Sequence, residues 1–374
     1  MAKQFQIIDL FCGCGGFGLG AELAGFNSLA AIDIDTTLQS AYKKNFPKTK
    51  VIQADLSKLE YHDWISILNG KRVDGVIGGP PCQGFSRIGK NDVCDERRSL
   101  LRDYFRHVKL LKPKFFIMEN VEGILDKKNI SELLEAINII KGEYKVIDPF
   151  VINSADIGAP TQRKRVLVIG YLPDYIDEMT LEDFIPKTKK RTTVRDAIID
   201  LPEPIDKCTS DDQFGWAQYK LNNQSELSSY AKKLRKPPQK NLGWSISKKM
   251  LNQNQVSGFF ITKHTEPVRR RYISTPQGSI DKVSKSKKLE WEGFCPTLRA
   301  GTGADKGSYQ AVRPLHPTEG RVITVREAAR LQGFPDWFVF HNTKWHSFRM
   351  IGNSVSPIVS EYILKIIKKK IIVN

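Results

Sequence analysis

The stretch GGPPCQGFS, residues 78–86, places a cysteine in a turn directly after the apolar run VDGVI. Two prolines stiffen the backbone before Cys82, and two glycines allow another group to approach closely, so we expect the thiol to be held in place. A cysteine is a strong nucleophile once its surroundings lower its pKa. The stretch therefore predicts a nucleophilic cysteine, with a buried and unreactive cysteine as the alternative.

Three further side chains could act with this thiol. Glu119 ends the apolar run KFFIMEN (114–120), and a carboxyl group in a closed pocket can stay protonated and donate a hydrogen bond. Its alternative role is to cap the helix expected after residue 122. Arg163 and Arg165 lie two residues apart before a strand, which predicts guanidinium groups on the same side. On their own, they could be a solvated basic pair.

A glycine-rich stretch, DLFCGCGGFGLG (9–20), could form a second part of the same site. Its glycines fit the GxGxxG fingerprint of dinucleotide-binding turns, and Asp33 or Asp35 follows about 20 residues later to accept ribose hydroxyls. Asp55 could accept an adenine amino group. A nicotinamide cofactor and S-adenosylmethionine both present a ribose and an adenine, so the stretch does not distinguish between these two ligands. A glycine-rich turn that binds no ligand is a third possibility.

The elements that would position these residues alternate between strands and helices. We expect strands at 5–10, 28–35, 50–56, 73–79, 114–120 and 165–171, with a helix at 99–111 whose apolar positions follow 3.6-residue spacing. Near-continuous apolar strands that alternate with helices predict an α/β, doubly wound, mostly parallel sheet covered on both faces. In such a sheet, ligands bind beyond the carboxyl ends of the strands, where Cys82 and the glycine-rich turn would meet.

The alternation of strand and helix patterns ends after residue 172. Residues 173–320 are rich in Pro, Gly, Asn, Gln, Ser and Lys, and helical patterns return only at 324–332 and 355–367. We therefore expect a catalytic and cofactor-binding domain at 1–172, a smaller irregular domain at 173–320, and a C-terminal segment at 321–374 that packs back on the first domain.

Charge points to a polyanionic partner. The 374 residues include 58 Lys and Arg against 41 Asp and Glu, a net charge of +17. Residues 213–320 alone hold 19 Lys and Arg against 7 Asp and Glu, so most of the excess lies there. A basic surface of this kind favours nucleic acid, although a solvated lysine-rich surface has the same composition.

Other classes of protein are disfavoured. The six cysteines are too sparse for a disulfide scaffold and contain no Cys-x-x-Cys pair, so neither disulfides nor a metal site is expected. No apolar run reaches the ~18 residues of a membrane span, and the N-terminus lacks the pattern of a signal peptide. We expect a cytoplasmic protein that does not contact a membrane.

Taken together, the motifs resemble those of the DNA (cytosine-5)-methyltransferase family. The motifs DLFCGCGGFGLG, GGPPCQGFS, MENV, QRKRVLVIG, RVITVREAARLQGFPD and IGNSVSP follow the family's usual order. The resemblance covers 5–172 and 313–370, and 173–312 falls in the family's variable slot. It implies a Rossmann-like enzyme that transfers a methyl group from S-adenosylmethionine to C5 of a flipped-out cytosine in a specific duplex DNA sequence.

The resemblance also implies roles for individual residues. Cys82 matches the nucleophile that bonds to cytosine C6, and Glu119 the donor at N3. Arg165 matches the residue that holds O2, with Arg163 supporting the active-site loop. The cofactor-binding positions are Phe11, Gly13, Gly16, Asp33, Ile34, Asp55, Leu56, Pro81, Leu100, Asn353, Ser354 and Val355. Ile34 departs from the aromatic residue that many relatives carry, which weakens stacking on adenine.

DNA contacts are expected from two segments. The polar segment 83–98 resembles the family's mobile loop, and residues 213–320 make up most of a target-recognition domain. The candidate DNA-binding residues are Gln83, Ser86, Arg97, Arg269, Arg270, Arg271, Thr297 and Leu298. Thr297-Leu298 resembles the family's Thr-Leu pair, but a turn leading from a strand explains it equally well. We expect a monomer, whose partner could be a restriction endonuclease acting on the same site.

Three alternatives stay open. A tRNA cytosine-5 methyltransferase of the same fold is the nearest, although the length and charge of 173–320 exceed what a small RNA-binding insertion needs. A DNA-binding module without activity is a second, and a nicotinamide oxidoreductase, based on the glycine-rich turn alone, is a third.

Overall fold

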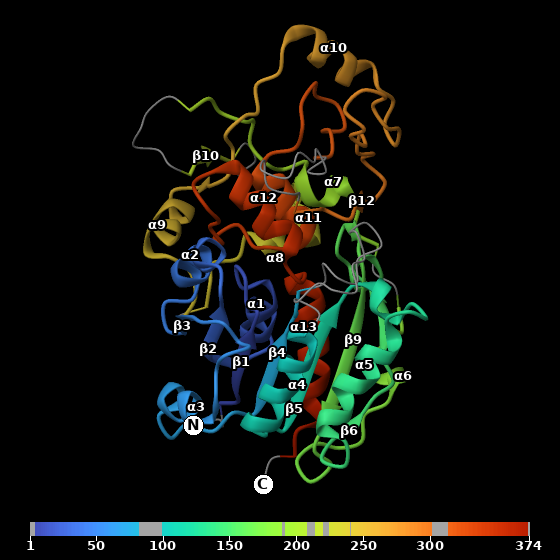
Figure 1. Ribbon diagram of the computed structural model, residues 1–374. Helices are drawn as coiled ribbons and strands as arrows, with labels where there is room; N and C mark the ends of the chain where they lie inside the picture. The colour runs from blue at the N-terminus through green and yellow to red at the C-terminus, as the bar shows by residue number, and fades with distance from the viewer. Residues whose placement is uncertain are drawn as a thin grey trace.

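The computed structural model describes residues 4–81, 99–188, 191–207, 214–219, 224–239, 241–300 and 313–372. Eight strands within these residues form one sheet in the order β3-β2-β1-β4-β5-β9-β6, with β7 also paired to β9 (Figure 1). The strands are β1 (Gln6–Leu10), β2 (Asn27–Asp33), β3 (Lys50–Gln53), β4 (Gly75–Gly78), β5 (Phe115–Asn120), β6 (Lys145–Val146), β7 (Phe150–Asn153) and β9 (Lys164–Tyr171).

The sheet is mostly parallel, as the sequence predicts. Strands β3, β2, β1, β4 and β5 run parallel, and β9 runs antiparallel to β5, β6 and β7. All six predicted strands are present. The structure adds β6 and β7 to this sheet, which the sequence analysis missed, and β6 spans only two residues, too few to show a period.

Helices cover both faces of the sheet because neighbouring residues along a strand point to opposite sides. Ile7 of β1 packs in a core with α1 (Gly16–Leu23), α2 (Thr36–Asn45) and α13 (Pro357–Lys370). Ile8 packs on the other face with α3 (Tyr61–Leu68), α4 (Leu100–Leu111) and α5 (Ile130–Ile137). The predicted doubly wound architecture is therefore confirmed.

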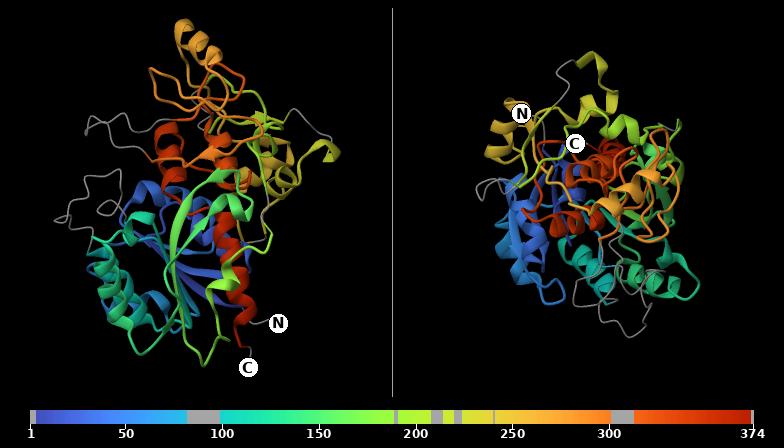
Figure 2. Two further views of the ribbon diagram at one scale, coloured as in Figure 1. Left: turned by 90° about the vertical axis from the view of Figure 1, so that its right-hand side faces the viewer. Right: turned by 90° about the horizontal axis from the view of Figure 1, so that it is seen from above.

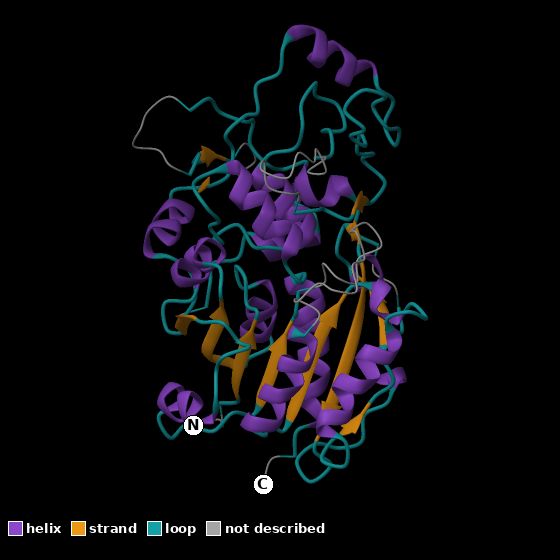
Figure 3. Ribbon diagram, viewed as in Figure 1, coloured by secondary structure: helices purple, strands orange, loops and turns teal. Residues whose placement is uncertain are grey.

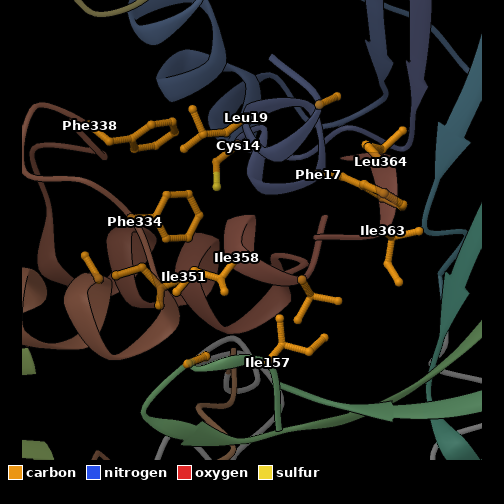
Figure 4. Close-up of a cluster of buried hydrophobic side chains, with 14 of the residues drawn as sticks. Cys14, Phe17, Leu19, Ile157, Phe334, Phe338, Ile351, Ile358, Ile363 and Leu364 are labelled. Atoms are coloured by element: carbon orange, nitrogen blue, oxygen red, sulfur yellow. The ribbon is translucent and has the colours of Figure 1, made fainter. Parts of the chain in front are cut away.

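The C-terminal segment returns to the first region of the chain. Helix α13 lies against α1, where the Ser360 hydroxyl donates to the Phe17 carbonyl. Figure 4 shows Phe17, Leu19, Ile358, Ile363 and Leu364 in one cluster with Phe334 and Phe338. Figure 2 shows α13 beside the sheet and α10 (Glu266–Ser274) at the opposite end of the molecule.

Residues 173–320 are here named the second region, and the part of it that the structure describes has little regular structure. The region holds α6 (Leu181–Phe184), α7 (Val194–Ile198), β10 (Ala217–Gln218), α8 (Ser229–Leu234), α9 (Ser245–Asn252), β11 (Gln255–Val256), α10 and β12 (Cys295–Pro296). Figure 3 shows mainly helices and loops there, with the large sheet confined to the other half. In the described part of the chain, no helix is long and apolar enough to cross a membrane.

Two further helices join the second region to the sheet. Helix α11 (Val325–Gln332) contacts α7 and α12 (Lys344–Asn353), and α12 also contacts α2. The sequence predicts that α11 packs on the first region, and the Leu331 carbonyl does accept a hydrogen bond from Thr161 at 2.6 Å. However, every residue of α11 is buried, including Arg326 and Arg330, so the helix has no solvated face.

Candidate active site

A cavity of about 430 Å³ lies at the carboxyl edge of the parallel strands. Its walls come from the turns after β1, β2, β3, β4 and β5 and, on the other side, from Arg163, Arg165 and the end of α12. All twelve residues predicted to bind a cofactor line it, namely Phe11, Gly13, Gly16, Asp33, Ile34, Asp55, Leu56, Pro81, Leu100, Asn353, Ser354 and Val355. This is the place where open α/β sheets bind their ligands.

The glycine-rich turn exposes its backbone to this cavity. Gly13 has a φ of 53°, and a Cβ placed on it would meet no atom within 4 Å. Its amide donates to Asp33 Oδ2 at 2.8 Å, while Asp33 Oδ1 accepts from the amide of Asp35 at 2.8 Å. The turn after β1 and the acidic end of β2 are therefore fixed to each other.

Ser354 and Val355, which line the cavity, pack closely against Gly16 of α1. A Cβ on Gly16 would lie 2.3 Å from the Val355 carbonyl oxygen and 2.9 Å from Ser354 Cβ, so no larger residue fits there. The Ser354 hydroxyl lies 3.0 Å from Cys14 Sγ. Burial raises the pKa of the Cys14 thiol to about 12, consistent with a packing residue.

Acidic groups dominate the wall near the glycine-rich turn. Asp9 is fully buried, and this burial raises the pKa of its carboxyl group to about 8, although a hydrogen bond from the Gly18 amide opposes the shift. Burial also raises the pKa of Asp33. Without a ligand, Asp9 is therefore mostly protonated at pH 7, and a positive charge nearby would favour its ionised form.

Arg349 is a cavity residue that the sequence analysis missed. It extends from α12 and forms an ion pair with Asp35, with Arg349 Nη2 2.6 Å from Asp35 Oδ2. Arg349 precedes Asn353 by four residues, and such positions share one face of a helix. That spacing is the signal in the sequence that could have identified Arg349, but the family motif IGNSVSP begins only at Ile351.

Glu119, Arg163 and Arg165 line the opposite part of the cavity. Arg165 Nε lies 2.9 Å from Glu119 Oε1. Glu119 does not cap a helix, because the short 3-10 helix Glu122–Leu125 has Val121 as its N-cap and no side-chain cap. Arg163 is buried and donates to the carbonyls of Gly352 at 3.1 Å and Leu298 at 3.4 Å.

Residues on both sides of the predicted nucleophile in the sequence line the cavity. Gly79, Pro80 and Pro81 line the cavity, and the Asn120 side chain donates to the Pro80 carbonyl at 3.3 Å. Leu100, the first residue of α4, also lines the cavity. Four predicted residues lie outside the described residues: Cys82, Gln83, Ser86 and Arg97.

The other predicted DNA-binding residues lie in the second region. Arg269 and Arg270 project from α10 and pair with the exposed Glu266 at 3.5 and 3.0 Å. Arg271 Nε instead lies 2.9 Å from the carboxylate of Asp281, which is buried. Arg271 therefore holds α10 in place, whereas its two neighbours carry charge at the surface.

Thr297 and Leu298 lie beside the active-site arginines and not at the far end of the second region. Strand β12 pairs with β8 (Thr161–Gln162), and the Thr297 hydroxyl donates to the Gln162 carbonyl at 2.8 Å. The Leu298 side chain is buried in the core. A DNA contact by either residue stays a prediction.

Comparisons with known proteins agree with this architecture. The family model of C-5 cytosine-specific DNA methylases matches residues 5–369. The Type II methyltransferase M.XorII of Xanthomonas oryzae is 41% identical over 97% of this chain and 85% of its own, and M.DdeI of Desulfomicrobium norvegicum is 32% identical over 95% and 86%.

Comparison with solved structures also finds methyltransferases. A crystal structure assigned as a prophage-encoded DNA modification methyltransferase of E. coli superposes with a TM-score of 0.87 at 41% identity, covering 98% of this chain and 99% of that one. The Dnmt2 methyltransferase of S. pombe shares the fold alone, with a TM-score of 0.58 at 18% identity over 98% and 99%. The chain belongs to the C-5 cytosine-specific DNA methylase family and is a DNA (cytosine-5) methyltransferase.

Proposed function

We propose that this enzyme methylates C5 of a cytosine flipped out of a specific duplex DNA sequence, using S-adenosylmethionine and a transient bond between Cys82 and cytosine C6. One observation carries the proposal. The predicted cofactor positions, Glu119 and both arginines line a single cavity, and the chain leads from that cavity at Pro81 directly into Cys82.

The cofactor part of the cavity suits S-adenosylmethionine. The open backbone at Gly13 and the fixed carboxylate of Asp33 suit a nucleoside, with Asp55 and Leu56 at the purine end. Asp9 lines the same cavity, and a positive sulfonium nearby would favour the ionised form of its carboxyl group. When bound, S-adenosylmethionine supplies an electrophilic methyl group.

The protein's own residues would activate the base. The Cys82 thiolate adds to C6, forming an S–C bond and moving the electron pair of the C5–C6 bond to C5. C5 then bonds to the methyl carbon as the bond between that carbon and the sulfonium sulfur breaks, which leaves S-adenosylhomocysteine. Glu119 donates a hydrogen bond at N3 as charge builds on the ring. Loss of the C5 proton to a base or to solvent, followed by cleavage of the S–C6 bond, restores the double bond and the thiolate.

Two arginines would hold this arrangement. Arg165 donates to the cytosine O2, and its side chain also orients the Glu119 carboxyl group 2.9 Å away. Arg163 lies behind them and donates to Gly352 and Leu298, so it joins the cavity to the C-terminal segment and the second region. Arg163 thus acts as a support for the site.

The DNA would be held by the second region, since a base inside a duplex cannot reach the cavity and flipping it out costs a few kcal/mol. The positive excess of residues 213–320 supplies contacts with phosphates. The exposed Arg269 and Arg270 on α10 are our candidates for contact with phosphate or base edges.

Methylation of tRNA is the other activity to test. Against it stand the size and charge of the second region, and the family model, whose description names DNA. The relatives with 41% and 32% identity are named Type II methyltransferases, which supports a modification enzyme paired with a restriction endonuclease for the same site.

The proposal can be tested with labelled S-adenosylmethionine. We expect label in duplex DNA, none in tRNA, and no transfer by Cys82→Ala, while a Cys208→Ala control remains active. Cys82→Ala should still bind DNA and cofactor. Turnover by Cys82→Ala, or label in tRNA alone, would contradict the proposal.

A further inference from the structure

Two side chains of α4 meet at one backbone carbonyl beside the cavity. The carbonyl of Leu56 accepts hydrogen bonds from Arg106 Nη2 and from His107 Nε2, both at 2.7 Å. Leu56 itself lines the cavity and follows Asp55, the other residue at the proposed purine end. The position of this turn is therefore set from α4.

A third residue fixes the state of the histidine. Trp64 Nε1 of α3 donates to His107 Nδ1 at 3.0 Å. An indole N–H only donates, so Nδ1 must be the bare acceptor nitrogen and Nε2 must carry the proton given to Leu56. Burial lowers the pKa of His107 to about 4, an effect that nearby Arg106 adds to, so the ring is neutral at pH 7.

Further hydrogen bonds fix the same turn. Asp55 Oδ1 accepts from the amide of Ser57 at 3.0 Å and from its hydroxyl at 2.7 Å. Arg106 Nη1 also donates to the Leu59 carbonyl at 2.7 Å. The conformation of residues 55–59 thus depends on hydrogen bonds within the turn and on Arg106 of α4.

We propose that the chain of hydrogen bonds Trp64–His107–Leu56 is a positioning device for the purine end of the cofactor site. This inference rests on the proposed function, because it assumes that the cavity binds S-adenosylmethionine. His107 and Trp64 do not line the cavity and act through Leu56. Helix α4 begins at Leu100, which does line it, so one helix shapes the cavity at two points.

The test compares three substitutions with a matched control. His107→Leu removes both hydrogen bonds, His107→Gln can still donate toward Leu56, and Trp64→Phe removes only the bond to Nδ1. His62→Leu serves as control, because His62 also lies on α3 but its side chain is 79% exposed. Calorimetry with S-adenosylhomocysteine measures binding, and methyl transfer gives KM for cofactor and DNA separately.

Loss of the hydrogen bond to the Leu56 carbonyl predicts that His107→Leu binds S-adenosylhomocysteine about threefold to tenfold more weakly. KM for the cofactor should rise by the same factor, with kcat and the KM for DNA unchanged, and His107→Gln should restore most of the affinity. Trp64→Phe should lose less affinity for S-adenosylhomocysteine than His107→Leu does. In 15N spectra of the wild type, the His107 ring should stay in its Nε2–H form from pH 6 to 8.

Two results separate the possible failures. If the wild type binds no S-adenosylhomocysteine, the proposed function itself fails. If the wild type binds it and folded His107→Leu and Trp64→Phe bind equally well, only the positioning role is overturned. A uniform fall in kcat and in both kinds of binding would show a general loss of structure instead, and would also overturn it.

Discussion

The sheet half and the second region differ in how much regular structure they contain. The sheet half is built on apolar strands such as β5, which is buried along its whole length, with helices on both faces. In the described part of the second region the strands have only two residues, but apolar side chains such as Phe259 and Leu289 continue the core of one face of the sheet. Helix α11, from the C-terminal segment, adds a polar connection to this apolar one.

Arginines of α11 make this connection. Arg326 donates to the backbone of Ser257 at 2.9 Å and of Phe338 at 2.7 Å. Arg330, which is 0% exposed, pairs with Asp336 at 2.5 Å and with Asp200 at 3.2 Å. A helix that sequence patterning treats as amphipathic thus uses its charged face to bind the second region.

The largest expected effect comes from breaking that connection. Arg330→Met leaves Asp200 and Asp336 buried without their shared cation, which should lower the free energy of unfolding by about 3–5 kcal/mol. Denaturant unfolding measures the loss. The control Arg102→Met removes an exposed pair with Glu135 and should cost less than about 1 kcal/mol. Equal losses would show that the buried pairs do not hold the halves together.

In the sheet half, the largest predicted electrostatic effect is that of Asp9. Its folded pKa of about 8 exceeds the ordinary 3.8, so between these values the folded protein keeps a proton that the unfolded chain releases. The free energy of unfolding should therefore fall as pH rises toward 8. Asp9→Asn should remove about 2 kcal/mol of that fall between pH 6 and 8. Unfolding of the cofactor-free protein measures it, and identical pH slopes would contradict the assignment.

At the cavity, where the C-terminal segment meets the sheet, Arg349 should matter more for ligand binding than for stability. Arg349→Met removes the ion pair between α12 and Asp35, and we expect a threefold to tenfold weaker affinity for S-adenosylhomocysteine, roughly 1 kcal/mol. Calorimetry checks this against the Arg102→Met control. Unchanged affinity would mean that α12 does not shape the cofactor site.

The smallest effect on stability is expected at the tip of the second region. Arg270→Ala removes a surface pair with Glu266 and should change the free energy of unfolding by less than about 0.5 kcal/mol. It should nevertheless weaken DNA binding and lower by about one the slope of the logarithm of the binding constant against the logarithm of the salt concentration. Arg271→Ala, which leaves the buried Asp281 unpaired, should destabilise the protein measurably. Equal stability of the two variants would contradict the division of roles on α10.

Much of the sheet half could be predicted because its signals are local. Apolar strands and the glycine-rich turn fix where the chain reverses, and parallel strands bring their carboxyl ends to one edge. The positions carried over from the family, from Phe11 to Val355, accordingly line one cavity, and the link between Glu119 and Arg165 follows from neighbouring strands.

The rest depends on contacts between distant residues, which leave little trace in a single sequence. Strand β6 has two residues, too few for a period, and the pairing of β12 with β8 joins residues more than a hundred positions apart. His107 looks like one more residue of an amphipathic helix, and only the fold brings Trp64 and Leu56 to its two nitrogens.

The most direct test of the account is to trap the proposed bond between Cys82 and cytosine. A duplex in which 5-fluorocytosine replaces the target base should, with S-adenosylmethionine, give a stable protein–DNA adduct, since fluorine cannot leave C5 as a proton does. Mass spectrometry should place the link on the peptide that contains Cys82. Absence of an adduct at a site proven to be methylated, or a link to another residue, would contradict the account.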